Sequence, residues 1–154
     1  MAWSDDGYTI ATGNQDRTVC IFDARNFKRP VKRMECRIAG CRALRFSPAG
    51  GGRRTLAVAE AADFVHFVDA VGWERGETVE FWGEVGGMEW TPDGGEVVVA
   101  NADKAVGGLM MFERARGGEL FGEDEDADAE QAFRWTRNRR LGKKAGADLE
   151  GLFV

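Results

Sequence analysis

Three cysteines and one histidine are the residues of this chain best suited to bind a metal. Cys36 and Cys41 are close enough in sequence to form half of a zinc site, and Cys20 stands apart from them. A structural zinc site needs four ligands, but there is no second cysteine pair and only one histidine, His66. We therefore predict no metal and no cofactor. The cysteines are expected to be small, reduced thiols, and His66, which lies within an apolar run, is expected to pack in a strand.

Catalytic patterns are also missing from the sequence. No glycine-rich loop precedes a step from a strand to a helix, and the paired carboxylates lie in predicted turns. No apolar run is long enough to span a bilayer, and the start, "MAWSDDGYTI", has neither the basic region nor the apolar core of a signal peptide. We predict a non-enzymatic protein of the cytoplasm or nucleus.

The charges are unevenly distributed along the chain. The net charge is −5, which gives no general case for binding nucleic acid. However, residues 25–54 hold ten basic residues and one acid, whereas residues 60–113 hold twelve acids and two bases. Such asymmetry indicates either a surface for a partner or solvated outer strands and loops.

A repeat organises residues 1–116. The pairs Trp3-Ser4, Phe46-Ser47 and Trp90-Thr91 recur at spacings of 43 and 44 residues. A hydrophobic residue followed by an acid ends each unit, at Asp23, Asp69 and Glu113. Two landmarks that stay in step over three copies predict repeats at about 1–23, 39–69 and 83–113.

Each repeat is expected to be β-structure. A turn such as "SDDG" or "TPDG" precedes a short apolar run, a second turn with an Asp follows, and a second apolar run ends the unit. The runs are apolar on both faces, which is typical of strands covered on both sides. We predict an all-β fold in which like sheets pack face to face, with no convincing helix before residue 117.

This layout resembles the WD-repeat β-propeller family. The stretch "NQDRTVCIFD" is similar to the most conserved segment of the family, with Phe22 in place of the usual Trp. "LRFSP", "ADFVHFVD" and "GLMMFERAR" resemble the C-terminal blades of poorly characterised WD-repeat proteins of plants and fungi. The family's Gly-His pair is missing, and Ala39-Gly40 lies near its expected place. The resemblance therefore implies that the family's buried Asp-His-Ser/Thr-Trp network is incomplete here.

The resemblance implies a protein-interaction scaffold rather than an enzyme. Some members dock onto the adaptor of cullin-RING ubiquitin ligases through a sixteen-residue box, and Ile10 to Arg25 fits it: small and apolar residues, then Asp16, then Phe22-Asp23-Ala24-Arg25. The implied partner site is therefore Asp16, Phe22, Asp23 and Arg25, in a ligase substrate receptor. The other interpretation is that Asp16 and Asp23 only hold turns. Phe22 would matter most to stability if its ring is buried between blades.

A second function class remains open. Arg53 and Arg54 in "GGGRRT" are similar to the Arg-Arg pair of phosphoinositide-binding propellers, although the surrounding residues do not match. The alternative function is a propeller that binds an anionic ligand, phosphoinositide or nucleic acid, through the basic segment 25–54.

The predicted strands make roughly two and three-quarter blades, too few for a ring of about four to eight. We expect the rest of the ring to come from further blades of a longer protein or from an oligomer. Residues 117–154 form a charged tail: "GEDEDADAE" is acidic and "RWTRNRRLGKK" is basic. Acids before bases, with apolar residues at helical spacing, predict a helix over roughly 126–141 with disordered flanks.

Overall fold

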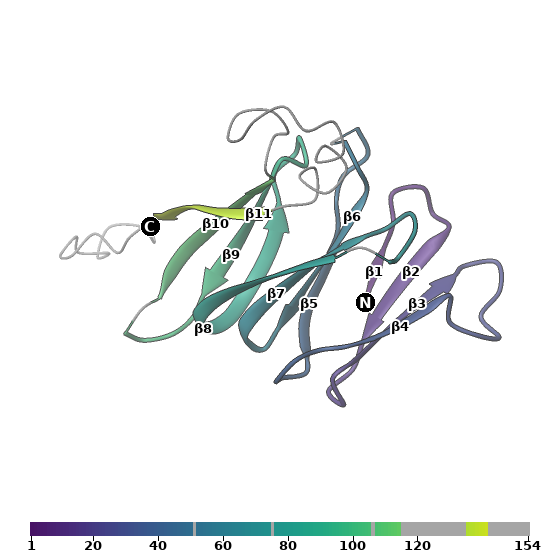
Figure 1. The fold of residues 1–154 in the computed structure, drawn as a ribbon, viewed down its shortest axis with the longest axis horizontal. Coiled ribbons are helices and arrows are strands. Elements are labelled where there is room, and N and C mark those ends of the chain that lie inside the picture. Colours follow the sequence, from purple (N-terminus) through teal and green to yellow (C-terminus); the bar gives the residue numbers. More distant parts are fainter. Residues whose placement is uncertain (51, 75, 106, 115–134, 142–154) are drawn as a thin grey trace, which may run out of the picture.

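The computed structural model describes residues 1–50, 52–74, 76–105, 107–114 and 135–141, and these residues form two antiparallel sheets and no helix (Figure 1). The first sheet has the strand order β1-β2-β3-β4, and the second has the order β11-β10-β9-β8-β7-β6-β5. The strands of the first sheet are β1 (Ala2–Trp3), β2 (Thr9–Gly13), β3 (Thr18–Asp23) and β4 (Lys32–Glu35). Those of the second are β5 (Cys41–Phe46), β6 (Thr55–Glu60), β7 (Ala62–Asp69), β8 (Gly76–Trp90), β9 (Glu96–Asn101), β10 (Gly108–Arg114) and β11 (Trp135–Leu141). The described residues include no helix long and apolar enough to cross a membrane.

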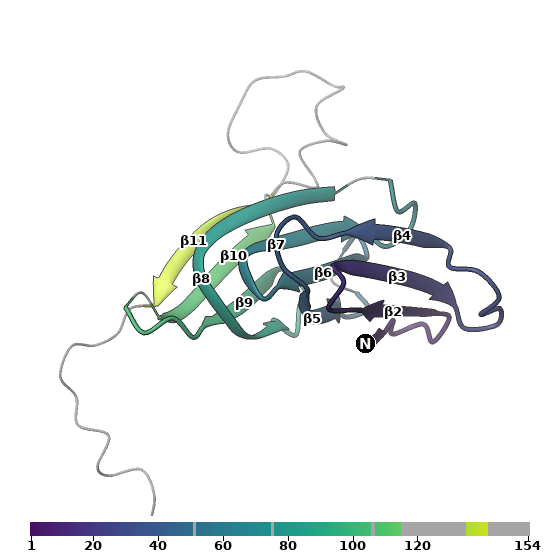
Figure 2. The same cartoon turned by 90° about the horizontal axis from the view of Figure 1, so that it is seen from below.

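The long strand β8 belongs to two four-stranded units. Its first part pairs with β7, ending at Glu84 opposite Ala62, and its second part pairs with β9, starting at Val85 opposite Asn101. Figure 2 shows β8 curving from one unit into the next. Near this change of partner, Gly83 has φ 138° and lies so close to the Asn101 side chain that a Cβ would collide with it. The described residues therefore form three blades: β1–β4, β5 to the first part of β8, and the second part of β8 to β11.

The three predicted repeats hold the first three strands of each blade. The fourth, outer strand of each blade lies after its repeat segment: β4, the first part of β8, and β11. The predicted all-β fold of about three four-stranded antiparallel blades is confirmed.

The core lies between the blades, and β6 shows how the sequence builds it. All six residues of "TLAVAE" are buried. Leu56 and Val58 pack toward the first blade, whereas Ala57 and Ala59 belong to the cluster shared with the third blade. Since successive side chains of a strand point to opposite faces, an apolar run without alternation is the pattern that a doubly covered strand requires.

The predicted helix over 126–141 is wrong for the part that the structure describes. Trp135–Leu141 is the strand β11, which pairs antiparallel with β10 from Leu109 opposite Leu141 to Arg114 opposite Trp135. An edge strand presents a row of unpaired N–H and C=O groups, so β10 offers a distant segment hydrogen bonds that local helical spacing does not reveal. Residues 126–134 and the predicted disordered flanks lie outside the described residues.

Candidate functional site

The predicted docking segment, Ile10–Arg25, runs through the second and third strands of the first blade. Asp16 lies in the turn between them, where its Oδ1 accepts hydrogen bonds from the Thr18 amide at 2.9 Å and the Thr18 hydroxyl at 2.5 Å. The Thr18 hydroxyl and amide lower the pKa of Asp16. Asp16 therefore holds the turn through Oδ1, as its place in the repeat predicts.

Asp23, the last residue of β3, and Arg25 form a bidentate ion pair. Arg25 Nε lies 2.9 Å from Asp23 Oδ1, and Arg25 Nη2 lies 2.7 Å from Asp23 Oδ2. The Arg25 guanidinium also lies 5.0 Å from the centroid of the exposed Tyr8 ring. Hydrogen bonding to Arg25 lowers the pKa of Asp23 to about 2. The Arg25 side chain is 70% exposed, so the pair is held in place and open to solvent.

Phe22 does not lie between blades. Val19 and Ile21 point into the contact with the second blade, and by strand alternation Phe22 points to the opposite face. There its ring is half-buried and tilted against Phe27, at a centroid separation of 6.1 Å. Among the described blades, therefore, the Phe22 ring is not buried between blades. Phe22 and the exposed Phe27 instead form an aromatic pair on the face away from the second blade.

Each of the two arginines proposed for anion binding is paired with a carboxylate. Arg53 bonds Asp69 through Nε at 3.2 Å and Nη2 at 2.7 Å, and the Asp69 side chain is 3% exposed. Arg54 bonds Asp6 of the first blade. The structure thus places Arg53 and Arg54 in ion pairs within and between blades.

A buried carboxylate that the sequence did not single out connects the first two blades. Glu60 ends β6 and is fully buried. It accepts hydrogen bonds from the amides of Arg37, Ile38 and Ala39, at 2.5, 2.9 and 2.7 Å, and these amides belong to the segment that leads from the first blade into the second. Burial alone would raise the pKa of Glu60, but the hydrogen bonds from these amides and from His66 outweigh it and lower the pKa.

His66 completes this network from the neighbouring strand. Its Nε2 lies 2.6 Å from Glu60 Oε1, and its Nδ1 lies 2.8 Å from the Thr78 hydroxyl. The predicted strand position of His66 is confirmed, but both nitrogens of its ring make hydrogen bonds. The family's Gly-His pair is missing from this sequence. A different arrangement is present, in which the Glu60 side chain holds the connecting segment through the backbone amides of that segment.

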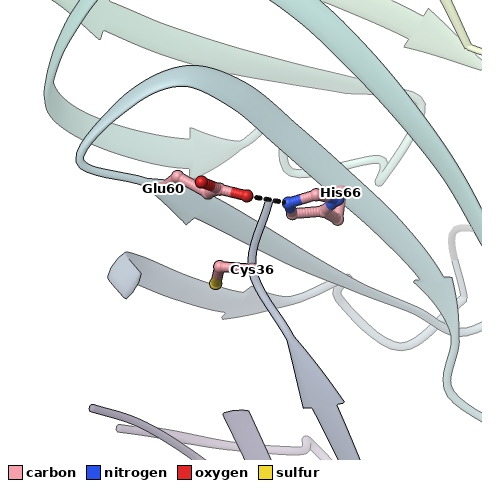
Figure 3. Close-up of side chains that lie close together, drawn as sticks. All are labelled: Cys36, Glu60 and His66. Atoms are coloured by element: carbon pink, nitrogen blue, oxygen red, sulfur yellow. Dashed lines mark hydrogen bonds and ion pairs between the residues drawn. The ribbon is translucent and has the colours of Figure 1, made fainter. Parts of the chain in front are cut away.

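Cys36 lies against the same two side chains (Figure 3). The Cys36 sulfur, a Glu60 oxygen and a His66 nitrogen all lie within 4.8 Å of one another. Burial, and secondarily the charge of Glu60, raise the pKa of the Cys36 thiol to about 12. Cys41, which is close enough to Cys36 in sequence to form half of a zinc site with it, is not in this group and directs its thiol to the Ala43 carbonyl at 3.6 Å. All three cysteines are free thiols.

A cleft of about 190 Å³ reaches this group from the outer side of the first two blades. Cys36 and His66 lie in its wall, together with Met34, Glu35, Glu77 and Thr78. The sequence signal for this site was weak, because its three residues are 24 and 6 positions apart along the chain. Only the register of β6 against β7 and the path of the chain after β4 bring them together.

The comparisons with known proteins identify the fold. No protein-family model and no curated protein matches the sequence. A chain in the crystal structure of the mitotic checkpoint complex matches with a TM-score of 0.62 and 24% identity, over 72% of this chain and 33% of that one. The WD40 domain of coronin from Toxoplasma gondii matches with a TM-score of 0.57 and 19% identity, over 70% of this chain and 28% of that one. The chain thus spans about a third of the length of these structures, and the predicted propeller fold is confirmed.

Proposed function

From three blades with the WD-repeat propeller fold, we propose that this chain is part of a non-enzymatic scaffold for other proteins. We further propose that Ile10–Arg25 docks onto the adaptor of cullin-RING ubiquitin ligases, so that the protein acts as a substrate receptor. The observation that carries the proposal is the exposed Asp23–Arg25 pair, which lies at the end of β3 beside the exposed ring of Tyr8. Arginine and aromatic residues are the types enriched at the energetic centres of protein interfaces.

The Asp23–Arg25 pair suits recognition because it is already ordered. Asp23 Oδ1 also accepts from the Arg25 amide at 2.9 Å, so the loop and the guanidinium are fixed by the same carboxylate. A preorganised side chain loses little conformational entropy on binding. The guanidinium retains N–H donors that a carboxylate or carbonyl of a partner can accept from, and charge-assisted bonds of this kind are about twice as strong as neutral ones.

The test is recovery of the adaptor from cells with the tagged chain as bait. We expect wild type to recover the adaptor and Arg25→Ala to lose most of it. Arg29→Ala is the matched control, since Arg29 is an exposed arginine of the same loop, and it should recover the adaptor as wild type does. Absence of the adaptor with wild type, or equal recovery with Arg25→Ala, would overturn the docking proposal.

The anion-binding alternative has less support. An anion at Arg53 and Arg54 would have to compete with Asp69 and Asp6 for guanidinium groups that those carboxylates already hold. The two classes differ in their salt dependence, because binding to a polyanion weakens steeply as salt rises. An anion site with several phosphate contacts should lose roughly a thousandfold or more in affinity between 50 and 200 mM salt. A loss of this size in partner binding would favour the anion site.

We also propose that the three blades pack against further blades, of the same protein or of a second copy. The face of the third blade turned away from the second carries Leu109, which is 42% exposed, and propeller rings contain about four to eight blades. The chain on its own should therefore self-associate in sedimentation experiments as its concentration rises. A compact monomer that melts sharply at every concentration would contradict this.

A further inference from the structure

We propose that Cys36, Glu60 and His66 form a binding site for a divalent transition metal, with Zn²⁺ the best match, that joins the first blade to the second. A thiolate, a carboxylate and an imidazole are the three ligand types that zinc takes in proteins. Each comes from a different stretch of chain: Cys36 follows β4, Glu60 ends β6, and His66 lies within β7 (Figure 3).

The separation of the donor atoms suits one ion. Zinc bonds of about 2.0–2.3 Å place two ligands of one tetrahedral ion roughly 3.3–3.8 Å apart. The three donor atoms here already lie within 4.8 Å of one another, so side-chain shifts of about 1 Å would bring them to the separations of zinc ligands. Movements of this size need no change in strand pairing.

The hydrogen bonds of the site can adapt to an ion without leaving a buried group unpaired. Glu60 has about four lone-pair positions, of which three face backbone amides and one faces His66 Nε2. The ion would take the place of the hydrogen between Nε2 and Oε1 and leave the amides bound. Thr78 keeps its bond to Nδ1 in either tautomer, because a hydroxyl both donates and accepts. A hydrogen bond to the second ring nitrogen is the usual support of a metal-bound histidine.

The charges also favour a divalent ion. Zn²⁺ with one thiolate, one carboxylate and one neutral imidazole is a net neutral unit, whereas Glu60 alone is a charge buried among dipoles. Burying a neutral unit avoids much of the cost of an isolated charge. The thiolate further selects a soft ion over Mg²⁺ or Ca²⁺, which prefer oxygen ligands.

The cleft supplies an entry path and the fourth ligand position. It opens onto Cys36 and His66, and its wall includes the carboxylate side chains Glu35 and Glu77. A site with three protein ligands and one position toward a cleft is the open type of zinc site. The competing explanation is a hydrogen-bonded polar cluster that binds no metal.

The experiment titrates the chelator-treated full chain with Co²⁺, followed by visible and near-ultraviolet absorption, and then displaces Co²⁺ with Zn²⁺. We expect one equivalent to bind, with a thiolate-to-cobalt charge-transfer band that Zn²⁺ removes. Cys36→Ser should abolish the band. His66→Gln should weaken binding by more than about 100-fold, since the loss of outer-shell partners alone costs roughly 10–100-fold. Cys20→Ser is the matched control and should bind as wild type does, because Cys20 is outside the group.

Two results would overturn the proposal: no charge-transfer band with wild type at one equivalent, or an unchanged band in Cys36→Ser. If Cys36→Ser does not fold, zinc K-edge absorption of wild type decides without a variant. A shell with one sulfur supports the site, and a shell with nitrogen and oxygen only, or with two sulfurs, contradicts it.

Discussion

The contact between the first and second blades differs from the contact between the second and third, although the same repeat builds both. The second contact is aromatic: Phe67 packs edge-on against Trp90 and Phe112, with centroid separations of 6.3 and 6.2 Å, and Phe81 packs against Phe112 at 6.5 Å. The first contact uses smaller side chains, among them Ala11, Val19, Ile21, Leu44, Leu56 and Val58. Buried rings supply area at the second contact. At the first contact the rings of Phe46 and Trp73 are only partly buried, and a buried polar network accompanies the aliphatic packing.

The residue at the end of the second strand of each of these two blades shows the same difference. In the second blade it is Glu60, which binds three amides of the preceding connection. In the third blade it is Asn101, which donates from Nδ2 to the Trp82 carbonyl at 2.7 Å. Both are buried, so each holds the connection that enters its blade. A blade is thus attached to the chain segment before it by a charged carboxylate in one case and by a neutral amide in the other.

The largest expected effect is on the aromatic contact. Phe67 is fully buried and touches both Trp90 and Phe112, so Phe67→Ala should lower the free energy of unfolding by about 3–5 kcal/mol. Urea denaturation followed by tryptophan fluorescence measures this, because Trp90 is part of the contact. Phe27→Ala, at a ring that is 57% exposed, is the control and should change the midpoint little. Similar losses for the two variants would mean that the aromatic cluster is not the main contact.

Glu60→Gln should have the next largest effect, and a more local one. The amide nitrogen that replaces one oxygen cannot accept hydrogen bonds, so the part-buried N–H donors that face it lose their partner, at about 1–3 kcal/mol. Hydrogen exchange should speed up at residues 36–41 and in the first blade, and stay slow in β9 and β10. Uniform acceleration across all three blades would show that the first contact does not open by itself.

The strands and their packing could be predicted from the sequence, and the Glu60 network could not. "TLAVAE" indicates a doubly covered strand because its residues are apolar without alternation, and that information is local. Glu60 appears in the same string as one of many acids, and its role depends on amides 21 to 23 residues away. The tail shows the same limit: local spacing predicts a helix over roughly 126–141, but pairing with β10 makes Trp135–Leu141 a strand. Asp23 and Arg25 could be selected from the sequence because both lie within one short motif, and their docking role stays a prediction.

A smaller effect on stability is expected at Asp6, which joins the first blade to the second through its ion pair with Arg54. Hydrogen bonds from the Ser4 hydroxyl and the Tyr8 amide, together with Arg54, lower the pKa of Asp6 from 3.8 to about 2. A carboxyl group with a lowered pKa stabilises the fold above its unfolded pKa, and this contribution is lost as the pH falls from about 4 toward 2. Asp6→Asn should therefore lower the melting temperature at pH 7, through hydrogen bonds worth about 1 kcal/mol.

The pH series supplies the check on Asp6. The difference in melting temperature between wild type and Asp6→Asn should be full at pH 7 and shrink as the pH approaches 2, because wild type then loses the same charge. Glu74→Gln, at an exposed acid of the second blade, is the control. A difference that stays constant down to pH 2 would assign the effect of Asp6→Asn to packing rather than to charge.

The smallest effect on stability is expected at Arg25, and it separates a binding residue from a structural one. Arg25 and Glu60 both take part in charged hydrogen bonds, but the Arg25 side chain is 70% exposed and the Glu60 side chain is 0% exposed. Water replaces the lost bond of an exposed pair, and exposed ion pairs contribute little to folding. Arg25→Ala should therefore leave the urea midpoint at the wild-type value, while adaptor recovery falls. Because Asp23 still binds the backbone amide of residue 25, the loop keeps its turn without the guanidinium. A variant that lost both stability and recovery would place Arg25 with Glu60 among the residues that hold the blade, and the loss of recovery would then report unfolding rather than docking.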